Sequence, residues 1–128
     1  MAEPARRVLV LEDSVLVSMA IEAALAERGF ETVLAGSLSA AKARLGGSPL
    51  LAALLDFQLP DGSSLELARE LEDMGCPIAI VSGADGDAVP AEFPFTKRFV
   101  KPVSAEDLAE WVASIDPSAL PVAAPPPT

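Results

Sequence analysis

The stretch "ALLDFQLPDG", residues 53–62, decides how the chain folds. A run of apolar residues ends at a single carboxylate, Asp56, and Pro60 and Gly62 then favour a turn. The longer run "LLAALLD" shows no alternation of polar and apolar residues, which is typical of a parallel strand covered on both faces. We therefore predict a buried strand whose carboxyl end carries Asp56.

Short apolar runs alternate with helical patterns on both sides of this strand. Strands are predicted at residues 8–11, 30–35, 50–56, 77–82 and 97–100, and helices at residues 14–29, 37–47, 63–75 and 104–115. Ser14 and Ser104 are predicted N-caps, Gly29 is a predicted stop, and Ser63 and Glu66 have the spacing of a capping box. This order of elements predicts a parallel sheet with helices on both faces.

Helical spacing also predicts which side chains of the first and last helices face the core. These are apolar residues that recur every three or four positions: Val17, Ile21, Ala24, Leu25, Leu108, Trp111, Val112 and Ile115. The segment "GADGDAVPAEFPFT", residues 83–96, instead holds two Gly and two Pro in 14 residues. It predicts a loop or a short turn of helix rather than a full helix. Within it, "ADGDA" lacks the later Gly and Glu of a calcium-binding loop and is interpreted as a turn.

Composition narrows the classes of function. The 128 residues suffice for one domain, and the formal net charge of −10 argues against nucleic acid and anionic membranes as partners. The chain has no histidine, which excludes a Ser-His-Asp triad and histidine-ligated metal centres. A single cysteine, Cys76, cannot form an internal disulfide, and no run is long enough for a signal-peptide core or a membrane span. We predict a cytoplasmic location.

Polar residues stand at the carboxyl ends of four predicted strands: Glu12 and Asp13 after the first, Asp56, Ser82 and Lys101. In open parallel sheets, ligands bind at this edge, and adjacent strands lie under about 5 Å apart. Carboxylates that close together need a compensating cation, and hard oxygen ligands suit Mg²⁺. The set matches the needs of phosphoryl transfer: an acceptor oxygen, a metal, and Lys and Ser donors for the transferred group.

Four motifs in this order resemble the receiver domain of bacterial two-component response regulators. They are "LVLEDS", "LLDFQLPDG", "IVSG" and "VKPV", and the resemblance spans residues 6–115. It implies a flavodoxin-like, doubly wound α/β fold with a five-stranded parallel sheet in the order 2-1-3-4-5 and a fourth helix that is short or missing. Residues 1–5 would be an N-terminal extension, and residues 116–128 a proline-rich tail or linker.

The resemblance also implies roles for the polar residues. Asp56 would accept a phosphoryl group from a phosphohistidine on a histidine kinase or histidine phosphotransferase. Mg²⁺ would be bound by Asp13, Asp56 and the backbone carbonyl of Gln58, with Glu12 acting through metal-bound water. A further hypothesis, based on position alone, is that the Gln58 carboxamide orients the water that removes the phosphoryl group.

Two more residues complete the implied site. Ser82 and Lys101 would contact the phosphoryl oxygens. The protein would act as a single-domain response regulator that relays or buffers a signal through a downstream protein partner, and would catalyse only its own phosphorylation and dephosphorylation. We predict that phosphorylation shifts a pre-existing conformational balance in residues 83–96.

The chain departs from the receiver pattern in one position and one element. Receivers usually carry an aromatic residue three positions before the lysine, but here that position is Arg98. Phe99 is adjacent and should point to the opposite face of its strand. Together with the reduced fourth helix, this puts output through a rotating aromatic in doubt. The pattern around "IVSG" resembles an alphaproteobacterial subgroup of receivers with a short Pro-containing loop in place of that helix.

Alternative readings remain beside the receiver. Haloacid-dehalogenase-like phosphatases share the ingredients, but their nucleophile ends the first strand and a second Asp follows two residues later, where this chain has Gln58. No nucleotide-binding glycine loop is present in the sequence. A receiver-like interaction module that signals without phosphate, or a receiver that is part of a longer hybrid kinase or regulator, stays open.

Overall fold

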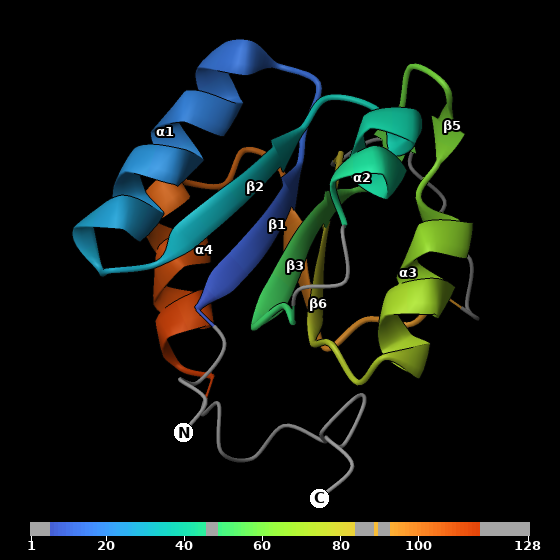
Figure 1. Cartoon of the computed structure of the whole chain (residues 1–128). Coiled ribbons are helices and arrows are strands. Elements are labelled where there is room, and N and C mark those ends of the chain that lie inside the picture. Colours follow the sequence, from blue (N-terminus) through green and yellow to red (C-terminus); the bar gives the residue numbers. More distant parts are fainter. Residues whose placement is uncertain (1–5, 46–48, 84–88, 90–92, 116–128) are drawn as a thin grey trace, which may run out of the picture.

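The computed structural model describes residues 6–45, 49–83, 89 and 93–115, and Figure 1 shows their strands and helices. Their order is β1 (Arg7–Leu11), α1 (Val15–Glu27), β2 (Glu31–Ala35), α2 (Leu38–Arg44), β3 (Ala52–Asp56), β4 (Gln58–Leu59), β5 (Gly62–Ser63), α3 (Leu65–Asp73), β6 (Ile78–Ser82), β7 (Lys97–Val100) and α4 (Ala105–Ala113). The predicted extension 1–5 and tail 116–128 lie outside the described residues.

One sheet contains β1, β2, β3, β6 and β7, all parallel to their neighbours, in the order β2-β1-β3-β6-β7. In terms of the five predicted strands this is the order 2-1-3-4-5, so the predicted topology is confirmed. The chain runs outward from β1 in both directions, and the direction of winding reverses between β1 and β3. Ligands of open α/β sheets bind beside such a reversal, at the carboxyl ends of the strands.

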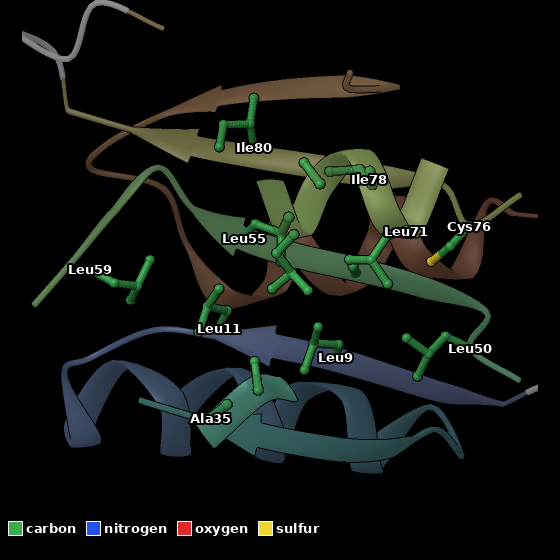
Figure 2. Packing of buried hydrophobic residues seen from close by; sticks show 14 of the residues in the cluster. Leu9, Leu11, Ala35, Leu50, Leu55, Leu59, Leu71, Cys76, Ile78 and Ile80 are labelled. Carbon is green, nitrogen blue, oxygen red and sulfur yellow. The ribbon is translucent and has the colours of Figure 1, made fainter. Parts of the chain in front are cut away.

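Helices cover both faces of this sheet (Figure 1): α1 and α4 lie on one side, and α2 and α3 on the other. Two buried clusters correspond to the two sides. Alternate residues of the central strands divide between them, so that Leu9 and Leu55 face one cluster while Val10 and Leu54 face the other. Figure 2 shows the first of these clusters. Every residue of β3 is buried, as predicted for a strand covered on both faces.

Most of the predicted caps are present. The hydroxyls of Ser14 and Ser104 accept backbone N–H groups in the first turns of α1 and α4, and Ser37 does the same for α2. Gly29 follows α1 with a φ of 84°, a conformation that glycine adopts at low cost. Serines placed before helical patterns were therefore good predictors of the starts of α1, α2 and α4.

Two local predictions were wrong. The Ser63–Glu66 capping box is absent because Ser63 belongs to a short antiparallel hairpin, β4–β5, and α3 begins after Ser64, whose side chain does not cap it. Val17 was predicted to face the core but is 43% exposed. Ser18 is buried in its place, beside the correctly predicted Ile21, Ala24 and Leu25, and it donates a hydrogen bond to the Glu12 carbonyl at 3.2 Å.

The last helix has the predicted orientation. Leu108 and Val112 are buried, and Trp111 and Ile115 pack partly buried against the same cluster. Of the residues described between β6 and β7 (83, 89 and 93–96), none is helical. The remainder of that loop, including "ADGDA", lies outside the described residues. Within the described part of the chain, no helix combines the length and hydrophobicity needed to cross a membrane.

Candidate functional site

The register of the central strands brings three carboxylates together at the carboxyl edge of the sheet. Leu11, the last residue of β1, pairs with Leu55 of β3, so the residues that follow these two are neighbours. They are Glu12 and Asp56. Oxygens of Glu12, Asp13 and Asp56 all lie within 4.8 Å of one another. We call these three residues the acidic cluster.

Burial differs strongly within the acidic cluster. Glu12 and Asp56 are 6% and 5% exposed, whereas Asp13 is exposed to solvent. The Glu12 carboxylate accepts the backbone N–H of Ser14 at 3.0 Å, which holds it at the start of α1. Two nearly buried carboxylates beside a third are unfavourable unless a cation compensates them. The site therefore has the electrostatics of a cation-binding site.

Lys101 supplies part of this compensation. Its Nζ lies 3.4 Å from Oδ2 of Asp56 and 3.7 Å from Oε1 of Glu12. Its backbone N–H donates to the carbonyl of Ser82 at 2.8 Å, which ties the end of β7 to the end of β6. Burial alone would lower the pKa of Lys101, but the nearby carboxylates of Asp56 and Glu12 outweigh it, so the pKa is raised and the ammonium stays charged.

One ammonium does not neutralise the acidic cluster. Burial raises the pKa of Asp56 to about 8, and the neighbouring Glu12 carboxylate adds to the shift. Burial also acts on Glu12, but hydrogen bonds from Asp56 and from the Ser14 N–H outweigh it, and the pKa of Glu12 is lowered. The opposite shifts show that the site disfavours two ionised carboxylates side by side, which is the electrostatic reason that a cation would stabilise it.

Ser82 ends β6, the strand next to Asp56, and is fully buried. Its hydroxyl has no hydrogen-bond partner among the residues that the structure describes. Buried hydroxyls are almost always hydrogen-bonded, so an unpaired one beside a carboxylate cluster indicates a place where a ligand oxygen can bind. The strand register supports this position, because Asp56 pairs with Val81, the residue directly before Ser82.

Gln58 lies on β4, two residues after Asp56, and is exposed. The hairpin that carries Gln58 was not predicted from the sequence. It pairs Gln58 with Ser63 and Leu59 with Gly62. The structure thus brings Glu12, Asp13, Asp56 and Lys101 into direct proximity, places Ser82 on the adjacent strand, and leaves the predicted role of the Gln58 carbonyl as a prediction.

A cavity of about 700 Å³ adjoins the acidic cluster, and sequence reasoning missed it. Its lining is mainly apolar and comes from the sheet, from the first turns of α1 and from the start of α4. It includes Val10, Leu54, Val81, Leu16, Val17, Ala105 and Leu108. The apolar run "VLVSM" at the start of α1 was the available signal, but its spacing was interpreted as core packing.

Beside the cavity, three side chains of α1 project into solvent. Val15, Leu16 and Met19 are 69%, 80% and 57% exposed, and we call them the apolar patch. A contiguous exposed apolar surface next to a polar site is typical of a protein-binding surface.

The residues present fit a divalent cation such as Mg²⁺. Carboxylate oxygens are the hard ligands that Mg²⁺ prefers, and one or two protein carboxylates with several waters are its usual environment. The acidic cluster supplies such oxygens within 4.8 Å of one another, and Asp13 is exposed enough to leave room for water. Lys101 balances only part of the negative charge, so a divalent ion would complete the compensation.

Comparison with known sequences gives a limited match. No protein-family model matches the chain. A segment of 70 residues is 37% identical to the transcriptional regulatory protein AruR of Pseudomonas aeruginosa. The match covers 51% of this chain and 29% of that protein, so the chain corresponds to less than a third of this relative's length.

Comparison with solved structures gives a match over most of the chain. The CheY-like response regulator receiver domain from Methylobacillus flagellatus is 24% identical with a TM-score of 0.73, and the alignment covers 88% of this chain and 99% of that one. SdrG from Sphingomonas melonis is 25% identical with a TM-score of 0.72, covering 89% and 98%. The beryllofluoride-activated NtrC4 receiver domain dimer is 20% identical with a TM-score of 0.72, covering 84% and 93%.

These likenesses define the class of fold. The chain has the flavodoxin-like fold of response regulator receiver domains, and the resemblance predicted from its four motifs is confirmed at that level. The alphaproteobacterial subgroup stays a prediction.

One departure from the receiver pattern has a structural counterpart. Phe99 pairs with Val81 and packs partly buried on the side of α1 and α4. Arg98, at the position where receivers usually carry an aromatic, is exposed. The prediction that Phe99 lies on the opposite face from Arg98 agrees with this arrangement.

Proposed function

We propose that the chain is a receiver that accepts a phosphoryl group onto Asp56 from a phosphohistidine of a histidine kinase or histidine phosphotransferase, in a Mg²⁺-dependent reaction. The observation that carries this proposal is the grouping of the acidic cluster within 4.8 Å, with Nζ of Lys101 3.4 Å from Asp56. The likeness in fold to receiver domains supports it.

In the proposed reaction, an oxygen of the Asp56 carboxylate forms a bond to phosphorus. The bond between phosphorus and the imidazole nitrogen of the donor breaks, and its electron pair stays on that nitrogen. Asp13, Asp56 and the Gln58 carbonyl would bind Mg²⁺, and Glu12 would act through metal-bound water. The bound ion would supply positive charge that keeps Asp56 ionised and balances the charge of the phosphoryl oxygens.

The other residues of the site stabilise and orient the transferred group. Lys101 already lies beside the acceptor oxygen, so its ammonium can bind a phosphoryl oxygen without a large movement. The buried hydroxyl of Ser82 can donate its proton to a second oxygen, because it has no competing partner within the described chain. Donors fixed before the reaction lower the barrier more than donors that must first reorganise.

The apolar patch supports the idea that a protein delivers the phosphoryl group. It borders the cavity beside Asp56, so an apolar helix face of the donor that packs on Leu16 would bring its phosphohistidine near the acceptor. We propose that the resulting signal is relayed or buffered through contacts with a downstream protein. With Arg98 exposed, the usual rotating aromatic is not available at that position for this output.

Intact-mass measurement tests the proposal directly. The wild-type protein is incubated with Mg²⁺ and an acyl phosphate, and we expect the mass of one phosphoryl group to be added. Asp56→Asn should abolish the gain, while Asp107→Asn, an exposed acid on α4, should retain it. Chelation of Mg²⁺ should also abolish it.

Failure of the wild-type protein to gain mass, with the fold intact by circular dichroism, would favour the second candidate. That candidate is a receiver-like interaction module that signals without phosphate, and the observation in its favour is the exposed Arg98 in place of an aromatic.

The lifetime of the phosphoryl group tests the hypothesis for Gln58. Its exposed side chain follows Asp56 by two residues, and from this position a carboxamide could orient an attacking water. We expect Gln58→Ala to change the rate at which the added mass is lost, and an unchanged rate would remove this role.

A further inference from the structure

Asp61 makes a contact that neither the motifs nor the proposed reaction explains. Its Oδ1 accepts the backbone N–H of Leu38 at 2.9 Å, and its Oδ2 accepts that of Ser39 at 3.2 Å. These are the first two residues of α2. Asp61 itself lies at the tip of the β4–β5 hairpin, 23 residues away from Leu38 in the sequence. The contact therefore joins the hairpin that follows Asp56 to a separate helix.

Capping of the N-terminus of α2 does not by itself account for this contact. Ser37 already caps the helix, because its hydroxyl accepts the N–H of Ala40 at 3.1 Å and its carbonyl accepts the N–H of Ala41 at 3.0 Å. A helix with its own N-cap gains only a further increment from a second acid at its start. At the other end of the contact, the hairpin is closed at its base, where the Ser64 N–H donates to the Phe57 carbonyl at 2.9 Å, and Asp61 acts at its tip.

The hairpin is short. Only two residue pairs form it, Gln58 with Ser63 and Leu59 with Gly62, and an isolated two-stranded ribbon is marginal in water. Leu59 is buried and anchors one side. At the tip, Gly62 has a φ of 135°, and a Cβ added there would lie 3.4 Å from Cδ1 of Leu38. Close packing on Leu38 and the two hydrogen bonds of Asp61 together anchor the other side to α2.

Both oxygens of Asp61 are available for this anchoring at neutral pH. The N–H of Leu38 is the main cause that lowers the pKa of Asp61, and the N–H of Ser39 adds to it, so the carboxylate remains ionised. An asparagine at this position would keep one acceptor oxygen and replace the other with an N–H donor. That side-chain N–H would point at one of the two backbone N–H groups of α2 and could not accept its hydrogen bond.

We infer that Asp61 is a positioning residue: by tying the hairpin tip to α2, it fixes the Gln58 backbone beside Asp56 in the geometry that cation binding requires. The inference rests on the proposed function, because it assigns the Gln58 carbonyl to that cation. Mg²⁺ demands near-ideal octahedral geometry, so a ligand on a loosened hairpin binds it less well. Residues that orient metal ligands typically contribute a factor of 10 to 100 in metal affinity.

The test is a Mg²⁺ titration of the whole chain, in which the backbone amide NMR shifts of Asp56 and Phe57 report metal binding. We expect the dissociation constant to rise about tenfold in Asp61→Ala, and less in Asp61→Asn. The matched control is Ser37→Ala, which removes the other cap of α2 without touching the hairpin. It should lower the melting temperature but leave the Mg²⁺ affinity unchanged.

A second readout needs no metal. In the metal-free protein, Asp61→Ala should shift the amide resonances of Gln58 and Leu59, whereas Ser37→Ala should not. Equal Mg²⁺ affinity in Asp61→Ala and the wild type would overturn the positioning role while leaving the proposed function intact, and so would an equal loss in Ser37→Ala. If the wild-type protein itself binds no Mg²⁺, both the proposed function and the positioning role are wrong.

Discussion

Replacing Asp56 with Asn should stabilise the protein when no metal is present. Asp56 is almost completely buried beside Glu12, and its pKa is raised from the usual 3.8 to about 8. The folded state therefore binds a proton at this carboxyl group more tightly than the unfolded chain does. Consequently, its contribution to the free energy of unfolding falls as pH rises through the window between these two values.

The size of the effect follows from the width of this window. Between the usual value of 3.8 and neutral pH lie roughly three pH units, each worth about 1.4 kcal/mol, which gives an upper limit of about 4 kcal/mol. The pKa of Glu12 moves in the opposite direction, and Lys101 at the solvent-facing edge already offsets part of the charge. We therefore expect Asp56→Asn to gain about half of that limit, ~2 kcal/mol, at neutral pH.

Urea unfolding with a chelator present measures the difference. Asp56→Asn should be the more stable protein at neutral pH, and its advantage should shrink as the pH approaches 4. Added Mg²⁺ should reverse the order, because each tenfold excess over the dissociation constant stabilises the wild-type protein by about 1.4 kcal/mol and acts less on the variant. If the variant is less stable than the wild type at neutral pH without metal, the carboxylates do not repel one another as the structure implies.

Three further predictions concern residues outside the site. Leu55→Ala should lower the free energy of unfolding by about 2 to 5 kcal/mol in urea titrations, since Leu55 is fully buried (Figure 2), and a loss under 1 kcal/mol would contradict this packing. Burial raises the pKa of Cys76 to about 12, so a maleimide should label it slowly in the native protein and quickly in urea; fast native labelling would show an accessible thiol. Glu106→Gln breaks an exposed 3.0 Å ion pair with Arg28 and should cost about 1 kcal/mol or less, which a large shift of the urea midpoint would refute.

Local features of the sequence were enough to predict the strands, the helices and a parallel sheet, whereas the strand order came from the resemblance to receiver domains. The uninterrupted apolar run that ends at Asp56 predicts a strand buried on both faces, and β3 is buried throughout. Serines at helix starts predict caps, and Ser14 and Ser104 are caps. These predictions succeed because strand burial and helix capping depend on residues a few positions apart, whose chemistry the sequence displays directly.

The approximate composition of the site was predictable for a related reason. Once a sheet is known to be parallel, the carboxyl ends of its strands lie at one edge, and acids at the ends of two adjacent strands are neighbours. The structure brings Glu12, Asp13 and Asp56 together as this argument requires, and adds Lys101. The sequence did not predict the pairing register that places Leu11 opposite Leu55, because register depends on how the whole sheet packs.

Other features were decided only by the tertiary structure. Helical spacing correctly predicted that Ile21, Ala24 and Leu25 face inward, but at the start of α1 it is Ser18, with its hydrogen bond to the Glu12 carbonyl, that is buried instead of Val17. The capping-box pattern at Ser63 gave way to the β4–β5 hairpin, whose tip residue, Asp61, binds a helix 23 residues earlier in the chain. Sequence patterns report the preferences of neighbouring residues, whereas these outcomes depend on contacts between distant segments, which form only when the elements pack together.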